Sequence, residues 1–158
     1  MTTPLLMLAI LFGSLLLALL LRATGRITNL RDAGAKGLAL LFLFTASGHF
    51  IETEAMAEML PPVLPARVPL VYLTGLLEIA LAGGIMLPMT RRIAGMIAIA
   101  VLIAFFPANI YAAVHHTGMG GHQWGPVYLL IRAPLQAILI AWTWWFAVKA
   151  GTPTPLTR

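Results

Sequence analysis

The sequence contains no cysteine and few charged residues. The absence of cysteine among the 158 residues excludes a disulfide framework, a thiolate metal site and a thiol nucleophile. Charged residues make up only 9% of the chain, whereas an ordinary soluble domain carries about a quarter. Disorder is excluded as well, because it requires low hydrophobicity and high charge, and 60% of these residues are hydrophobic. The composition therefore predicts a membrane protein.

Five apolar stretches predict five membrane-spanning helices in a single all-α domain, since a spanning helix needs about 20 mostly apolar residues. The second stretch is short, and we expect its helix to continue past Ile51 with three solvated glutamates near the interface. The Gly34–Gly37 stretch predicts a hinge between the first helix and the rest. The five stretches are Pro4–Leu21, Gly37–Ile51, Val68–Pro88, Ile93–Val114 and Val127–Val148, and the glutamates are Glu52, Glu54 and Glu58.

The positions of the basic residues predict the orientation, because short cytoplasmic loops carry an excess of Lys and Arg. Eight of the ten basic residues fall in alternate connections, and only Arg67 and Arg132 fall elsewhere. We therefore predict a multi-pass protein of the inner (plasma) membrane with its N-terminus outside and its C-terminus cytoplasmic. The net charge of +5 is then explained by the membrane topology and does not indicate a nucleic-acid partner. The eight residues are Arg22, Arg26, Arg31, Lys36, Arg91, Arg92, Lys149 and Arg158.

The first apolar stretch is either a retained membrane helix or a secretory signal peptide. The stretch Pro4–Leu21 lacks a preceding basic residue, which a secretory signal peptide normally has. We therefore expect a retained helix, and cleavage near Ala23 or Gly34 would contradict this. Residues 149–158 form a short polar segment that we expect to be a cytoplasmic tail.

Five polar side chains interrupt the apolar spans, where such groups are costly and tend to face the bundle interior. At about 1.5 Å per residue, Glu78 lies ~15 Å below the outer surface and Gln136 ~14 Å. Asn109 and Arg132 lie at ~8 Å by the same measure, and His49 lies near the outer end of its helix. All five positions therefore fall in the outer half of the membrane or near its midplane, where they are candidates for a ligand site.

Charge and spacing suggest how these residues meet. Glu78 and Arg132 form the natural ion pair, because an unpaired charge at that depth is expensive. Gly75 lies one turn before Glu78, where a small residue permits close helix approach. Two interpretations stay open: internal hydrogen bonds and an ion pair that only fix the packing, or a pocket that binds a polar head group or moves protons. In the second, Glu78 or His49 is the candidate catalytic group.

A histidine-rich loop connects the last two spans. His115, His116 and His122 lie close together with Met119 between them, and such ligands suit copper, nickel or zinc. The glycines of the loop fix no coordination geometry, so we expect a solvated loop and no metal site. We also expect no haem, flavin or thiol site, since His49 alone supplies no axial pair within the membrane.

Four short motifs occur in order along the chain, and together they resemble the DoxX family of small prokaryotic membrane proteins over Gly37–Phe146. The resemblance implies a four-helix core over residues 37–148, with Pro4–Leu21 added before it. It also implies a subunit or accessory of a quinone-linked redox system, with other membrane redox subunits as partners and quinone as a possible ligand. The motifs are Phe44-Thr45-Ala46-Ser47-Gly48-His49-Phe50, Gly75-Leu76-Leu77-Glu78-Ile79, Phe106-Pro107-Ala108-Asn109-Ile110-Tyr111-Ala112 and Ile131-Arg132-Ala133-Pro134-Leu135-Gln136.

Three functional hypotheses follow. In the first, Arg132 and Asn109 hydrogen-bond a quinone carbonyl and Glu78 or His49 handles the proton, since quinone reduction consumes protons. The second is a small-solute transporter or channel, which the apolar stretches Leu81–Leu87 and Ile93–Ala104 disfavour because they interrupt a polar path. The third is a non-catalytic assembly or scaffold protein. Whether the chain is an enzyme, and its oligomeric state, stay open.

Overall fold

The computed structural model describes residues 2–149, and every regular element in this part of the chain is helical. Five stretches have the length and apolar composition to cross a membrane, and η1, α6 and η2 together make the fifth. This confirms the predicted all-α, multi-pass architecture. Arg158 and the predicted tail lie outside the described residues, apart from Lys149. The elements are α1 (Thr2–Ala23), α2 (Leu30–Ile51), α3 (Thr53–Glu58), α4 (Arg67–Met86), α5 (Arg91–Val114), the 3₁₀ helix η1 (His122–Tyr128), α6 (Leu129–Thr143) and the π-helical turn η2 (Trp144–Val148).

The second helix departs from its prediction at both ends. It begins at Leu30, about two turns before the predicted start, because the Asn29 side chain accepts the backbone N–H groups of the next turn and caps the helix. The predicted continuation past Ile51 is wrong, since α2 ends there and the separate helix α3 follows. The predicted hinge at Gly34–Gly37 is also wrong. Both glycines are helical, and the ring of Phe146 lies where a side chain at Gly34 would be.

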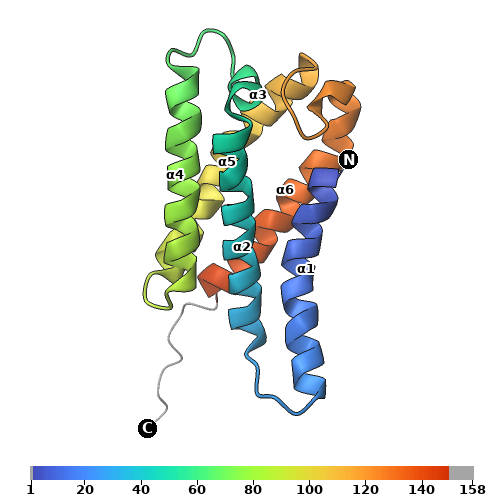
Figure 1. Ribbon diagram of the computed structural model, residues 1–158, viewed down its shortest axis with the longest axis vertical. Coiled ribbons are helices and arrows are strands. Elements are labelled where there is room, and N and C mark those ends of the chain that lie inside the picture. The colour runs from blue at the N-terminus through green and yellow to red at the C-terminus, as the bar shows by residue number, and fades with distance from the viewer. Residues whose placement is uncertain (1, 150–158) are drawn as a thin grey trace.

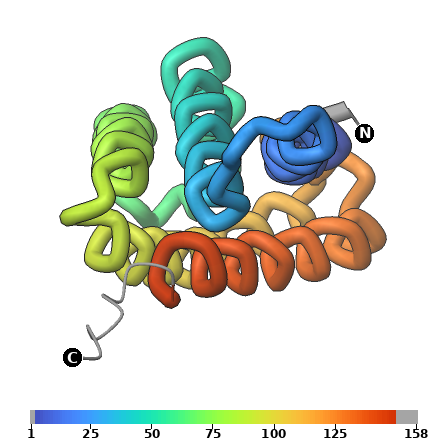
Figure 2. The backbone as a smooth tube through the Cα atoms, turned by 90° about the horizontal axis from the view of Figure 1, so that it is seen from below, coloured from blue at the N-terminus to red at the C-terminus, as the bar shows by residue number. Residues whose placement is uncertain are grey.

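The long helices form two layers (Figures 1 and 2). In one layer α2 lies between α1 and α4 and packs against both. The other layer contains α5 and α6, which contact each other. Figure 2 shows α6 strongly inclined, so that it passes diagonally beneath α2 and α1. This inclination brings the start of α6 to one end of the bundle and η2 to the other (Figure 1).

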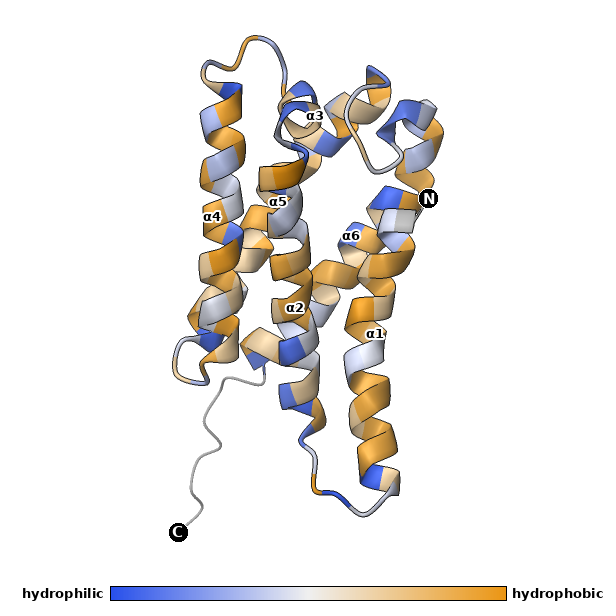
Figure 3. Cartoon of the chain, viewed as in Figure 1, coloured by the Kyte–Doolittle hydropathy of each residue, from blue (hydrophilic) through white to orange (hydrophobic). Residues whose placement is uncertain are grey.

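The two ends of the bundle differ in chemistry. One end, which we call the basic end, contains the turns at residues 24–29 and 87–90 and the end of η2; the other, the loop end, contains residues 59–66 and 115–121 (Figure 1). Apolar residues dominate between the two ends, and polar ones gather at them (Figure 3). The basic end corresponds to the side predicted to be cytoplasmic, and the orientation itself stays a prediction.

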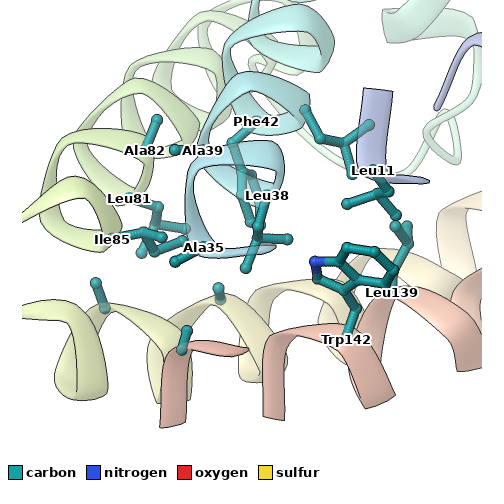
Figure 4. Close-up of a cluster of buried hydrophobic side chains, with 14 of the residues drawn as sticks. Leu11, Ala35, Leu38, Ala39, Phe42, Leu81, Ala82, Ile85, Leu139 and Trp142 are labelled. Atoms are coloured by element: carbon teal, nitrogen blue, oxygen red, sulfur yellow. The ribbon is translucent and has the colours of Figure 1, made fainter. Parts of the chain in front are cut away.

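The main apolar core lies toward the basic end, where α1, α2, α4, α5 and α6 meet (Figure 4). Leu38, Ile85 and Leu139 are fully buried there, and the Trp142 indole N–H donates a 2.9 Å hydrogen bond to the Gly34 carbonyl oxygen. Small residues bring the backbones together, since the hydrophobic effect does not drive helices together within lipid. A Cβ atom at Gly95 would lie 2.8 Å from the Cβ of Ala147. Close packing therefore holds this half of the bundle together.

A buried arginine, Arg91 of α5, links α4 and α2 at the basic end. The Arg91 side chain is buried, and its Nε donates to the Ile85 carbonyl oxygen at 2.8 Å. One Nη atom of Arg91 donates to Asp32 at 2.7 Å, and Lys36 pairs with the same carboxylate at 2.9 Å. Arg91 therefore has a structural role beyond the topological one that its position in a short turn predicts.

Candidate binding site

A cavity of about 360 Å³ lies between the two layers in the half of the bundle nearer the loop end. This volume falls within the range of small-molecule sites, about 300–1,000 Å³. Most of its lining is apolar, and the polar residues form two groups, one from each layer. The apolar lining residues are Met7, Leu38, Leu41, Phe42, Met56, Met59, Leu60, Leu70, Val71, Leu102, Phe105, Ala108 and Leu139; the polar ones are Thr45, His49, Thr74, Glu78, Asn109 and Arg132.

The first polar group is centred on Glu78 of α4. The Thr45 hydroxyl donates to Glu78 Oε2 at 2.7 Å, and His49 Nε2 lies 3.7 Å from the same oxygen. The other ring nitrogen, His49 Nδ1, faces the Val71 carbonyl oxygen at 2.9 Å and the Thr74 hydroxyl at 3.0 Å. Both ring nitrogens of His49 are therefore fixed, and the carboxylate is held by α2 rather than by the opposite layer.

Close helix contact makes this first group possible. At Gly75, one turn before Glu78, a Cβ atom would lie 2.7 Å from the Cβ of His49. The predicted reason for a small residue at this position is therefore confirmed. On α2, Thr45 lies four residues before His49. On α4, Thr74 lies four residues before Glu78. Each threonine therefore shares a helix face with one member of the His49–Glu78 pair. That spacing is a signal that could have added both threonines to the predicted site.

The second polar group is centred on Arg132 of α6. Arg132 Nε donates to Asn109 Oδ1 at 3.0 Å, and Nη1 donates to Gln136 Oε1 at 2.7 Å. Asn109 Nδ2 donates to the Phe105 carbonyl oxygen at 2.8 Å, and Gln136 donates to the Leu102 carbonyl oxygen. Two side chains that are themselves anchored to α5 therefore orient the guanidinium. Gln136 does not line the cavity, but it accepts a hydrogen bond from Arg132 and so orients the guanidinium.

The predicted ion pair between Glu78 and Arg132 is wrong. The two side chains line the same cavity, but the ion pairs of residues 2–149 join Glu78 only to His49 and leave Arg132 without a carboxylate. The reason is the layering: α4 packs chiefly on α2, and Arg132 meets the side chain of Asn109 from α5. The cavity therefore separates a carboxylate from a guanidinium.

The three loop histidines have different environments. His115 is exposed and stacks on the ring of Tyr111, and His116 is exposed near the Gln123 carbonyl oxygen. His122 is instead buried, with Nε2 3.1 Å from Asn109 Oδ1. Within the described part of the chain no three metal-ligating side chains are gathered. The expectation of a solvated loop is therefore wrong for His122, which belongs to the Arg132 group.

The chain matches over residues 38–147 the family described as "Domain of unknown function (DUF8561)". The matched segment is more than half of the 158 residues. The chain belongs to the DUF8561 family. No curated protein and no solved structure matches it.

The family assignment corrects the resemblance drawn from the sequence motifs. The DoxX family does not match, although the DUF8561 match covers nearly the same stretch as the motifs. The motifs were short runs around Pro, Gly, Asn, Glu and Arg, and small helical bundles with polar groups in the membrane need such residues whatever their family. The redox role that the DoxX resemblance implied loses its support, and the DUF8561 description assigns no activity.

Proposed function

We propose that this chain is a membrane-embedded binding protein for a small amphiphilic molecule that carries an oxygen-bearing head group. The observation that carries the proposal is the cavity of about 360 Å³ with an apolar lining and two separate polar groups. The head group lies between Arg132 on one side and the His49–Glu78 pair on the other. The apolar part of the ligand lies against side chains such as Phe42, Leu102 and Phe105.

The two alternatives fit the described residues less well. A scaffold held together by internal polar contacts needs no cavity, and close packing is the main attraction between helices in lipid. A transporter needs a continuous polar path. Toward the basic end the space between the layers is filled by the apolar core, in which Leu38, Ile85 and Leu139 are fully buried. The cavity therefore has the character of a binding pocket and not of a channel.

A quinone is one head group that the cavity suits chemically. Its carbonyl oxygens accept hydrogen bonds, which Arg132 supplies, and its reduction consumes protons, which a His49–Glu78 pair could supply. A role as subunit or accessory of a quinone-linked redox system rests on this chemistry alone. We therefore treat a quinone as one test ligand among the amphiphiles.

A photoreactive ten-carbon alcohol carrying a diazirine tests the proposal on the full chain in detergent micelles. We expect labelling of peptides from α2 and α5, and an excess of unlabelled decan-1-ol should suppress it. Ala108 lines the cavity, whereas Ala104, one turn earlier on α5, is exposed. Ala108→Leu should fill the cavity and reduce the suppressible labelling several-fold, while Ala104→Leu should not change it.

Two results would count against the proposal. Labelling spread evenly over the lipid-facing helices, with no suppression by decan-1-ol, would show that the cavity holds no such molecule. Equal labelling of the Ala108→Leu and Ala104→Leu variants would show that the bound molecule lies elsewhere. Suppression by decylubiquinone at lower concentration than decan-1-ol would favour the quinone version.

A further inference from the structure

Arg132 brings a positive charge into the cavity with no acidic partner in the described part of the chain. From this charge imbalance we infer that the natural ligand is an amphiphilic monocarboxylic acid whose carboxylate binds Arg132. The inference rests on the proposed function and narrows its ligand class. Three observations support it: the positions of the acidic side chains, the separate placement of the His49–Glu78 pair and the orientation of the guanidinium.

The chain has five acidic side chains, all within residues 2–149, and none reaches Arg132. Asp32 pairs with Arg91 and Lys36 at the basic end, far along α2 from the cavity's polar groups. Glu78 pairs with His49. The other three are exposed around α3, beyond the end of α2: Glu52, Glu54 and Glu58. No acidic side chain within residues 2–149 therefore compensates Arg132.

Glu78 belongs to the other polar group of the cavity, away from Arg132. Its Oε2 accepts the Thr45 hydroxyl at 2.7 Å and lies 3.7 Å from His49 Nε2. His49 Nδ1 faces the Val71 carbonyl oxygen and the Thr74 hydroxyl, so the imidazole is fixed beside the carboxyl group. Glu78 therefore has its partners within its own layer, and Arg132 is left as a cation of the cavity that one carboxylate neutralises.

The guanidinium is oriented and retains free donors. Asn109 and Gln136 take two of its five N–H groups, and Arg132 itself lines the cavity. A guanidinium can donate two parallel hydrogen bonds to a carboxylate. An ionised guanidinium in a membrane is costly unless it is paired or solvated. A bound carboxylate supplies that pairing, while the apolar lining accommodates the hydrocarbon chain.

Competition against the photoreactive alcohol tests this inference with three unlabelled ten-carbon probes: decanoic acid, decan-1-ol and methyl decanoate. We expect the acid to halve the cavity labelling at a concentration lower than the neutral probes by about ten-fold or more, as a charge-assisted hydrogen bond gives. Arg132→Gln should remove this preference, and Arg132→Lys should retain part of it. Arg92→Gln, which alters an exposed arginine on α5, should leave the preference unchanged.

The outcomes separate the inference from the proposed function. If the neutral probes suppress cavity labelling and the acid competes no better than they do, the carboxylate assignment is overturned while the binding function stands. If no probe suppresses labelling in the wild-type chain, both are overturned. The comparison of acid, alcohol and ester uses only the wild-type chain, so it remains decisive even where Arg132→Gln fails to fold.

Discussion

Arg132 Nε donates a 3.0 Å hydrogen bond to Asn109 Oδ1, and this bond joins the side chains of α6 and α5 at the cavity wall. The same oxygen lies 3.1 Å from Nε2 of the buried His122. Asn109 is held in turn by its bond to the Phe105 carbonyl oxygen. One amide therefore connects the cavity to the loop that contains His122, and it orients the cation on which the proposed ligand binding depends.

Replacing Asn109 with Asp should give Arg132 an acidic partner within the protein. The isosteric carboxylate keeps an acceptor at Oδ1 but loses the Nδ2–H that donates to the Phe105 carbonyl oxygen, so we expect the chain to fold with lower stability. The new negative charge should remove the preference for decanoic acid over decan-1-ol in the labelling competition. Asn109→Ala should instead lower the free energy of unfolding by about 1–3 kcal/mol, because buried donors lose their acceptor. An Asp variant that still prefers the acid as strongly as the wild type would contradict the charge argument.

Two glycines of α4 offer a matched test of helix approach. A Cβ at Gly75 would lie 2.7 Å from His49 Cβ, whereas one at Gly83 would meet nothing within 4 Å. Gly75→Ala should cost about 1–3 kcal/mol of unfolding free energy through overpacking and should displace His49 from Glu78. Gly83→Ala should be neutral or gain up to about 1 kcal/mol of helix propensity. Thermal unfolding followed by tryptophan fluorescence compares the two, and equal effects would refute the close contact.

Glu78 and Arg132 have different partners, so substitutions at these two positions should change the unfolding free energy additively. Because the two side chains do not pair, Glu78→Gln and Arg132→Gln should change the unfolding free energy independently, adding within about 0.5 kcal/mol. Arg132→Gln and Asn109→Ala remove members of one hydrogen-bonded group and should depart from additivity by about 0.5–3 kcal/mol. Double-mutant cycles measure both. Strong coupling between Glu78→Gln and Arg132→Gln would indicate that these two side chains do form an ion pair.

The basic end should affect stability without affecting binding. Arg91→Gln removes the donor to Asp32 and to the Ile85 carbonyl oxygen, so we expect a loss of about 1–3 kcal/mol in unfolding free energy. The neighbouring Arg92 is exposed, and Arg92→Gln should change stability by no more than about 0.5 kcal/mol. Both variants should keep wild-type labelling of the cavity. Reduced labelling of Arg91→Gln at temperatures where it remains folded would mean that the two ends are coupled.

The spans and the residues of the site could be predicted from the sequence more readily than their partners. Apolar runs revealed five spans because the thickness of a bilayer sets the length of a helix. Costly polar residues within them identified His49, Glu78, Asn109 and Arg132, which do line one cavity. Their similar depths below the outer membrane surface follow from the rise of a helix alone.

The pairings were not predictable because they depend on which helices become neighbours. Opposite charge suggested a bond between Glu78 and Arg132, but the layers place a threonine and a histidine beside the carboxylate. His122 follows several glycines, so its sequence context indicates a solvated loop, yet a tertiary contact with Asn109 buries it. Short motifs also misidentified the family, because the same polar residues serve many helical bundles.

A native mass spectrum of the full chain, extracted from its own membrane without added lipid, would show whether the cavity holds an amphiphilic acid. We expect one bound adduct per chain with the mass of an amphiphilic acid, retained in the exposed-face variant Ala104→Leu and lost in the cavity-filling variant Ala108→Leu. A spectrum with no adduct on the wild-type chain, or with the same adduct on both variants, would contradict the claim that the cavity is a binding site.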